Sequence, residues 1–333
     1  MKVRKLAALG AATVLAAAMA ACGTDDDAGG NGNGNGNGEW PDEIVLGLVP
    51  SQDVDELVED ADVLADLISA ELDHPVRAEI TQNYTALVVA MQTGQAHIGM
   101  FGPIALVQAA DQADANVVLQ SIRRGTESYH TQWFTNNPER FCQTDVVEAE
   151  NPEGNTVSYC NGTDAAEFGP VGDEALAEVE AGETIMFVDE GSASGYYYPA
   201  TQLQAAAGLD PFNDIDAQFG GNHPNAALAV QRGDAEIGVS FDDVRNDLVE
   251  EDPAIGSDLV VFAWSDEIPN DGVAVAGDLP QDLQDAITDA FVAVIETDEG
   301  LQAFDDVYSI EGLVPADLDA LDVARQVAAN FGD

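Results

Sequence analysis

The stretch TIMFVDEGSASGY, residues 184–196, joins an apolar segment to a turn bounded by two glycines. Its first five residues predict a buried strand, and we expect a helix to follow from Gly195 to Ala207. Glycine lets the backbone approach a ligand closely, and a helix N-terminus presents unpaired N–H groups to an anion. The turn is therefore a candidate oxyanion site, built from Ser192, Ala193, Ser194 and Gly195.

The same turn has two simpler interpretations. Serine is a preferred N-cap residue, so the turn can serve only to start a helix. Its glycines also imitate the GxSxG nucleophile elbow of hydrolases, but the central position holds Ala193 instead of serine. The turn is therefore no evidence for an esterase.

Short strands alternate with amphipathic helices on both sides of this turn. We predict strands at 44–49, 76–80, 96–100 and 117–119 with helices at 54–72, 84–92 and 103–112, and later strands at 184–188, 215–219, 237–239 and 260–264 with helices at 195–207, 225–232, 244–249, 280–296 and 315–331. This order predicts an α/β fold with two lobes, each a mostly parallel sheet covered by helices. We assign 40–132 and 262–333 to the first lobe and 133–261 to the second, with the ligand cleft between them.

The N-terminus carries an export signal. A basic segment and an uncharged apolar run predict a secretory signal peptide at 1–21. Small residues then precede Cys22, as in the lipobox of bacterial lipoproteins, although Met19 replaces the usual leucine; ordinary cleavage beside an incidental cysteine is the alternative. Residues 22–39 are rich in Gly and Asn and predict a flexible tether. We therefore expect an extracytoplasmic protein, anchored to the cell membrane by a lipid on Cys22.

The composition narrows the class of partner. The 62 Asp and Glu residues against 10 Lys and Arg give a net charge of −52, which repels nucleic acid. The acids are dispersed without metal-ligand spacing, which favours adaptation to a salty medium over a cation store, and we expect neither a metal nor a cofactor. An even pair of cysteines in an exported chain predicts a disulfide between Cys142 and Cys160.

Other polar or aromatic residues follow predicted strands. Tyr84 opens a helix, Phe101 precedes a Gly-Pro step, and His223 lies in a glycine turn before a helix. Asp243 and Asp271 lie in later turns. Taken singly, each has an ordinary explanation in core packing or a solvated turn.

Taken in order, these segments resemble the phosphonate, phosphate and phosphite-binding proteins of ABC importers. The resemblance spans about 44–304, and its most specific parts are the serine turn, the Gly-x-His turn at His223 and the sequence AVQRGDA at 229–235. It implies the two-lobed type II periplasmic-binding fold with two crossovers. It also implies a monomer that works with a membrane permease and a cytoplasmic ATPase.

The resemblance also implies roles for single residues. Ser192, Ser194 and His223 would bind the phosphorus oxyanion, and Tyr84 would close on it from the other lobe. Asp243 and Asp271 match positions that hold the amino group of an aminophosphonate or accept a P–OH hydrogen bond, and the first role is favoured here. Three departures concern the ligand: Ala193 replaces a frequent threonine, Phe101 replaces a tyrosine of some relatives, and the segment 136–182 is longer.

Two rival functions stay open. A secreted phosphoryl-processing enzyme would need a nucleophile with a base, or a two-metal carboxylate cluster. The four histidines, His74, His97, His130 and His223, show no such spacing, so we expect no catalytic residue. The other rival is a binding protein of the same fold for phosphate, phosphite or another small anion such as a sulfonate.

Overall fold

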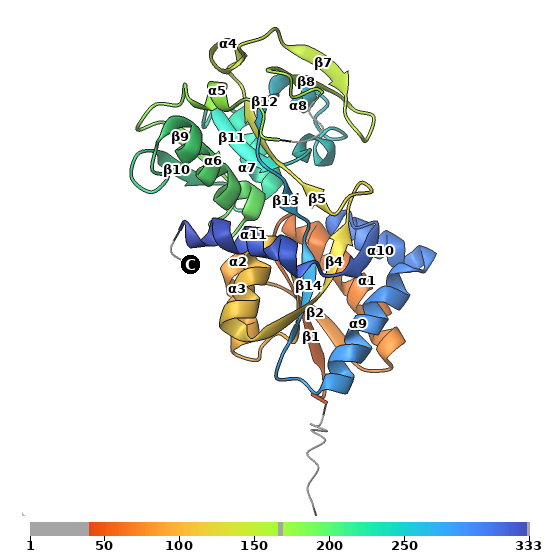
Figure 1. Ribbon diagram of the computed structural model, residues 1–333. Helices are drawn as coiled ribbons and strands as arrows, with labels where there is room; N and C mark the ends of the chain where they lie inside the picture. Colours follow the sequence, from red (N-terminus) through yellow and green to blue (C-terminus); the bar gives the residue numbers. More distant parts are fainter. Residues whose placement is uncertain (1–39, 166–168, 332–333) are drawn as a thin grey trace, which may run out of the picture. The chain divides into compact units, whose positions relative to one another are not determined.

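The computed structural model describes residues 40–165 and 169–331. The expected signal peptide at 1–21, Cys22 and the tether at 22–39 lie outside these ranges. Within them, no helix is both long and apolar enough to cross a lipid bilayer. The described chain is built on two large β-sheets, each accompanied by helices (Figure 1).

The first sheet has six strands, in the spatial order β15 (Gly312–Pro315), β4 (Ala115–Ile122), β14 (Gly272–Ala276), β3 (Ile98–Phe101), β1 (Ile44–Leu48) and β2 (Val76–Ile80). Four strands run in one direction, while β14 and β15 run in the other. The helices are α1 (Val54–Leu72), α2 (Tyr84–Gln92), α3 (Pro103–Ala113), α9 (Gln281–Ile295), α10 (Asp298–Tyr308) and α11 (Leu318–Ala329). Helices α2 and α3 lie on one side of the sheet, and α1, α9 and α10 lie on the other (Figure 1).

The second sheet has seven strands, in the order β10 (Asp216–Phe219), β9 (Thr184–Phe187), β11 (Ile237–Phe241), β6 (Thr131–Thr135), β12 (Val260–Trp264), β8 (Thr156–Tyr159) and β7 (Val147–Glu150). All run in one direction except β6 and β7. Its helical segments are α4 (Pro138–Phe141), α5 (Asp173–Leu176), the π-helical turn η1 (Ala193–Tyr197), α6 (Tyr198–Ala207), α7 (His223–Gln231), the 3-10 turn η2 (Val244–Asp247) and α8 (Ile255–Asp258).

The chain passes between the sheets twice. The short strands β5 (Ser128–Tyr129) and β13 (Ile268–Pro269) pair with each other in these two connections. The expected lobe boundaries, at 132/133 and 261/262, fall inside β6 and β12, which pair with each other in the second sheet. We therefore propose the crossovers at 123–130 and 265–271, so that each strand stays whole.

The predicted α/β architecture with two sheets is confirmed, and most predicted elements are present. The helix at 54–72, the strand at 76–80 and the helix at 84–92 have the predicted bounds. The sequence pattern does not predict α10, β14 or β15, and the expected helix at 315–331 begins only at Leu318. Helix α10 starts with Asp-Glu-Gly, so its first turn shows no hydrophobic periodicity. Its apolar face is formed by later residues, and Ala303, Phe304, Val307 and Tyr308 are buried.

Two glycines set the position of helix α2 on the first sheet. Gly47 of β1 and Gly99 of β3 are register partners. A Cβ atom on Gly47 would overlap with Leu87 of α2, and one on Gly99 would overlap with the Phe101 ring and contact Met91 of α2. The helix therefore packs directly against the backbone of the central strands, and this fixes its first residue, Tyr84, at their carboxyl ends.

The predicted disulfide between Cys142 and Cys160 is confirmed, with 5.6 Å between the Cα atoms. It joins the end of α4 to the end of β8 and encloses the β7–β8 hairpin. Cys160 is 1% exposed, so the bridge ties the segment 136–182 to the core of the second sheet.

Replacing both cysteines by alanine should lower the free energy of unfolding by about 3 kcal/mol, because the bridge closes a loop of 18 residues. Urea unfolding of the oxidised protein and of the double variant measures the difference. Reduction of the natural protein should reproduce the midpoint of the variant. Identical midpoints for the oxidised protein and the variant would show that the bridge contributes nothing.

Candidate functional site

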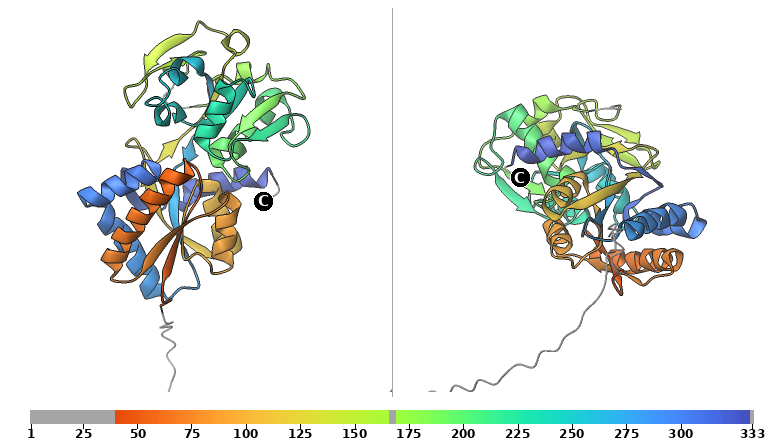
Figure 2. Two further views of the ribbon diagram at one scale, coloured as in Figure 1. Left: turned by 180° about the vertical axis from the view of Figure 1, so that it is seen from behind. Right: turned by 60° about the horizontal axis from the view of Figure 1, so that its bottom comes forward.

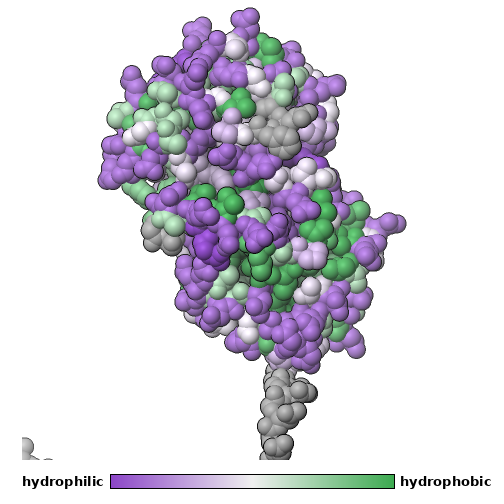
Figure 3. Space-filling view, viewed as in Figure 1, coloured by the Kyte–Doolittle hydropathy of each residue, from purple (hydrophilic) through white to green (hydrophobic). Residues whose placement is uncertain are grey.

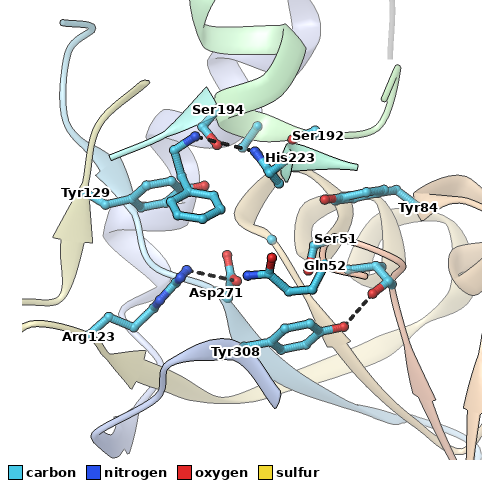
Figure 4. Close-up of a pocket in the computed structure, with 14 residues that line it drawn as sticks. Ser51, Gln52, Tyr84, Arg123, Tyr129, Ser192, Ser194, His223, Asp271 and Tyr308 are labelled. Atoms are coloured by element: carbon cyan, nitrogen blue, oxygen red, sulfur yellow. Dashed lines mark hydrogen bonds and ion pairs between the residues drawn. The ribbon is translucent and has the colours of Figure 1, made fainter. Parts of the chain in front are cut away.

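A small cavity lies between the two sheets, at the carboxyl ends of β1, β3 and β11 (Figure 4). The space open to the centre of a water-sized sphere is about 30 Å³, so the cavity is small. The cavity therefore suits a compact group of a few heavy atoms. Its lining residues are Val49, Ser51, Gln52, Tyr84, Gly102, Arg123, Tyr129, Ser192, Ala193, Ser194, His223, Phe241, Asp271 and Tyr308.

Tyr84 and His223 reach the cavity from the two sheets, and each is the first residue of a helix. Asn83 caps α2 and Asn222 caps α7, and each side chain accepts a 2.8 Å hydrogen bond from a backbone N–H three residues later. Asparagine is a preferred N-cap residue. The local sequence therefore fixes where both helices begin, and with it the place of both candidate ligand contacts.

Close backbone contacts join the two sides of the cavity. The backbone N–H of His223 donates to the carbonyl of Ser51 over 3.1 Å. A Cβ atom on Gly191 would lie 2.6 Å from Cβ of Tyr84, so only glycine permits this approach. The structure is therefore a closed form, in which the serine turn rests on the start of α2.

The serine turn supplies directed donors. The Gly195 N–H donates to Ser192 Oγ over 3.0 Å, which makes Ser192 the N-cap of η1. The first N–H groups of a helix have no partner within the helix, and here they belong to Ala193 and Ser194, which line the cavity. Burial raises the pKa of Tyr84 and of Tyr129 well above the usual value, so both remain neutral hydroxyl groups.

The ring of His223 is oriented by strand β11. Its Nδ1 atom lies 2.7 Å from Ser240 Oγ and 3.4 Å from the backbone N of Phe241. A backbone N–H can only donate, so Nδ1 accepts and the proton of the neutral ring is on Nε2. Burial, with a contribution from Arg123, lowers the pKa of His223 to about 3. Near pH 7 the side chain is therefore a neutral Nε2–H donor.

One cation and one acid complete the cavity. Arg123 Nη1 lies 3.6 Å from Asp271 Oδ2 (Figure 4), and the guanidinium lies over the Phe241 ring, 5.5 Å from its centroid. Arg123 and Asp271 therefore form an ion pair, but 3.6 Å is too long for a good hydrogen bond. The guanidinium and the carboxylate can both still form hydrogen bonds with a ligand. Burial raises the pKa of Asp271, and Arg123 offsets part of this shift.

Six of the nine predicted ligand residues line this cavity: Tyr84, Ser192, Ala193, Ser194, His223 and Asp271. The other three do not. Phe101 is buried beside Gly99, and the N–H of Gly195 is used by the Ser192 cap. Asp243 is buried against Arg245.

The carboxylate of Asp243 forms a two-pronged ion pair with Arg245, with N···O distances of 2.9 and 2.7 Å. Burial alone would raise the pKa of Asp243, but Arg245 holds it below the usual value. Arg245 is fully buried and also donates to the carbonyls of Ser158 and Leu259. Asp243 is therefore committed to the fold and is not available to a ligand in the cavity.

Sequence reasoning missed seven lining side chains: Val49, Ser51, Gln52, Arg123, Tyr129, Phe241 and Tyr308. Ser51 and Gln52 follow the first strand, so the rule that placed Tyr84 at a strand end could have found them. Arg123 follows β4 and is one of few basic residues in the chain. An arginine directly after a strand is unusual in so acidic a protein. This feature of the sequence could have identified Arg123 as a candidate ligand residue.

Comparisons with known proteins show the family and the fold of this chain. A sequence model of the family of periplasmic substrate-binding proteins of phosphonate ABC transporters matches residues 46–321. A curated relative, the phosphate-import protein PhnD of Mycolicibacterium smegmatis, is 22% identical over 282 residues, which are 82% of this chain and 77% of the relative.

Solved structures show the same fold. PhnD1 from Prochlorococcus marinus in complex with methylphosphonate has a TM-score of 0.71 and 18% identity, covering 88% of this chain and 99% of that one. A binding protein component of an ABC phosphonate transporter from Pseudomonas aeruginosa has a TM-score of 0.68 and 18% identity, covering 86% and 85%. The predicted fold class, a two-lobed periplasmic-binding-protein fold, is confirmed.

Nitrogen-detected NMR should show His223 as the neutral Nε2–H tautomer, without titration between pH 5 and 8. The reason is that its pKa is about 3 and its Nδ1 atom already accepts from Phe241. Because the folded-state pKa lies below the unfolded value, this residue favours unfolding as the pH falls from about 6.5 toward 3. A ring that titrates near pH 6.5, or that carries its proton on Nδ1, would contradict the assignment.

Proposed function

This chain belongs to the family of periplasmic substrate-binding proteins of phosphonate ABC transporters, and we propose that its cavity captures a small phosphorus oxyanion that shares one proton with Asp271. Methylphosphonate is the proposed ligand, with phosphite and phosphate as close alternatives. A sulfonate, which cannot supply that proton near neutral pH, is the less favoured anion. The proposal is supported by the charges and the size of the cavity.

The observation that carries the proposal is the pairing of Arg123 with Asp271 beside neutral donors. With Asp271 ionised and His223 neutral, the formal charges of these groups cancel. A dianion would then place a negative oxygen beside the carboxylate, whereas a P–OH group can donate to it. Because burial raises the pKa of Asp271, the proton can also reside on the carboxyl group. In both arrangements ligand and carboxylate share one proton.

An aminoalkylphosphonate, the ligand favoured by the sequence, fits this cavity less well. Asp243 is paired with Arg245, which leaves Asp271 as the one acid that lines the cavity within residues 40–165 and 169–331. Arg123 lies beside Asp271 and would repel an ammonium group. We therefore rank this ligand below methylphosphonate.

We also propose that the protein binds its ligand without chemical change and without a cofactor. Ser240 and His223 resemble a nucleophile and its base, since Ser240 Oγ lies 2.7 Å from Nδ1. However, Ser240 is fully buried and does not line the cavity, so its oxygen has no access to a ligand there. This hydrogen bond is better explained as the support that turns Nε2 toward the cavity.

The cellular role follows from the family and the N-terminal sequence. We propose that a lipid on Cys22 and the tether at 22–39 hold the protein outside the cell membrane. There it would deliver its ligand to a membrane permease driven by an ATPase. One chain completes the cavity, which supports action as a monomer.

Asp271→Asn should change the selectivity of the cavity. The natural protein should bind methylphosphonate, phosphite and phosphate and reject sulfate, which has no proton to share at pH 7. Asparagine removes the negative charge, so sulfate should bind at least tenfold better while methylphosphonate is weakened. Calorimetry with this panel and with 2-aminoethylphosphonate gives the ratios of Kd.

Ser194→Ala is the matched control, because it should weaken every phosphorus ligand by roughly 10- to 100-fold and leave their order unchanged; a hydrogen bond to a charged group contributes about 1.5–3 kcal/mol. Thermal unfolding without ligand checks that both variants fold. Unchanged rejection of sulfate in a folded Asp271→Asn variant would refute the shared proton.

A further inference from the structure

Helix α11 is fixed to the first sheet. Leu321, Ala324 and Ala328 are buried at helical spacing, and the helix packs against α3. Arg325 also contacts both carboxylate oxygens of Asp111 in α3, with N···O distances of 3.0 and 3.1 Å. Because α3 covers the first sheet, α11 moves together with that lobe.

The end of α11 reaches the other lobe. In Figures 1 and 2 the dark-blue helix runs from the first sheet toward the green elements of the second. Phe331, just after the helix, packs edge-on against Tyr197 at 4.9 Å between ring centroids. Its ring also lies 5.6 Å from that of Phe212 and 5.7 Å from that of Tyr196. Edge-on and tilted pairs at such distances are favourable.

The rings around Phe331 are joined directly to the candidate ligand site. Tyr196 and Tyr197 belong to η1, the turn that begins after Ser192 and contains Ser194. The backbone N–H of Tyr197 donates to the carbonyl of Ser192 over 3.1 Å. A displacement of these two tyrosines would therefore displace the serine donors as well.

A second contact joins the same two places. Gln108 of α3 donates from Nε2 to the hydroxyl of Tyr197 over 3.3 Å, and Gln108 is 9% exposed. Helices α3 and α11, both fixed to the first sheet, thus hold η1 from the same side. The contacts cross from one lobe to the other without passing through the crossovers at 123–130 and 265–271.

We propose that Phe331, Tyr196, Tyr197 and Phe212 form an aromatic clasp that favours the closed form, with Phe331 as a positioning residue for ligand capture. Rotation of the lobes about the crossovers must separate Phe331 from the other three rings. The clasp therefore makes closure more favourable before a ligand arrives, and it sets the serine turn in its binding position. The apparent affinity scales with the fraction of protein in the binding-competent form. This inference rests on the proposed binding function, but it concerns the aromatic clasp and not the residues that line the cavity.

Phe331→Ala should weaken methylphosphonate binding about tenfold by lowering the closed fraction. Phe331→Tyr keeps the ring and should bind like the natural protein. Leu318→Ala, at the other end of α11 where the side chain is 60% exposed, is the matched control and should also be unchanged. Calorimetry gives the Kd values. Small-angle scattering of the ligand-free proteins should give a larger radius of gyration for Phe331→Ala alone, and saturating ligand should remove the difference.

Three results would overturn the clasp: a Kd of Phe331→Ala within twofold of the natural protein, a loss that Phe331→Tyr shares, or weaker binding with unchanged scattering of the ligand-free form. If Phe331→Ala fails to fold, Phe212→Ala tests the same ring contact. The scattering comparison needs no ligand. A natural protein that binds no phosphorus oxyanion would therefore refute the proposed function while the clasp is still tested.

Discussion

An anion can be held by a chain of net charge −52 only through groups within hydrogen-bond reach of it. Charges farther away than the Debye length, about 8 Å at physiological salt, are largely screened. The cavity meets this requirement with backbone N–H groups of the serine turn, tyrosine hydroxyls, the Nε2–H group of His223 and the guanidinium of Arg123. Among the residues that the structure describes, Arg123 is the one formal positive charge that lines the cavity, and Asp271 balances it.

The donors can act together on one anion only when the two lobes are closed. The donors come from both sheets, so they converge only when the start of α7 meets the segment after β1. Besides the bond from His223, Asn222 Nδ2 donates to the carbonyl of Gln52 over 3.2 Å. Most of the face in Figure 3 is hydrophilic, in keeping with the abundant acids, while the donors line a small cavity between the two sheets.

The sequence predicts well those parts that depend on local patterns. Hydrophobic periodicity gives the bounds of α1, β2 and α2, and strand-end glycines and serines point to the turn at Ser192. Long-range pairing escapes this reasoning. Tyr308 of α10 lines the cavity, and its hydroxyl donates to the carbonyl of Val49, 259 residues away in the sequence. The acidic first turn of α10 makes the amphipathic pattern of this helix hard to recognise. Asp243 was expected at the ligand because it matches an acidic position of the resembling family, and the sequence does not show that Arg245, two residues later, pairs with it.

The most direct test of the shared proton is to count the protons taken up on binding. Calorimetry of methylphosphonate binding, in buffers of different ionisation enthalpy and above the second ionisation of the free ligand, measures that number. We predict uptake of about one proton by the natural protein, with an affinity that falls as the pH rises, and no uptake by Asp271→Asn. Binding of the dianion without proton uptake by the natural protein would contradict it.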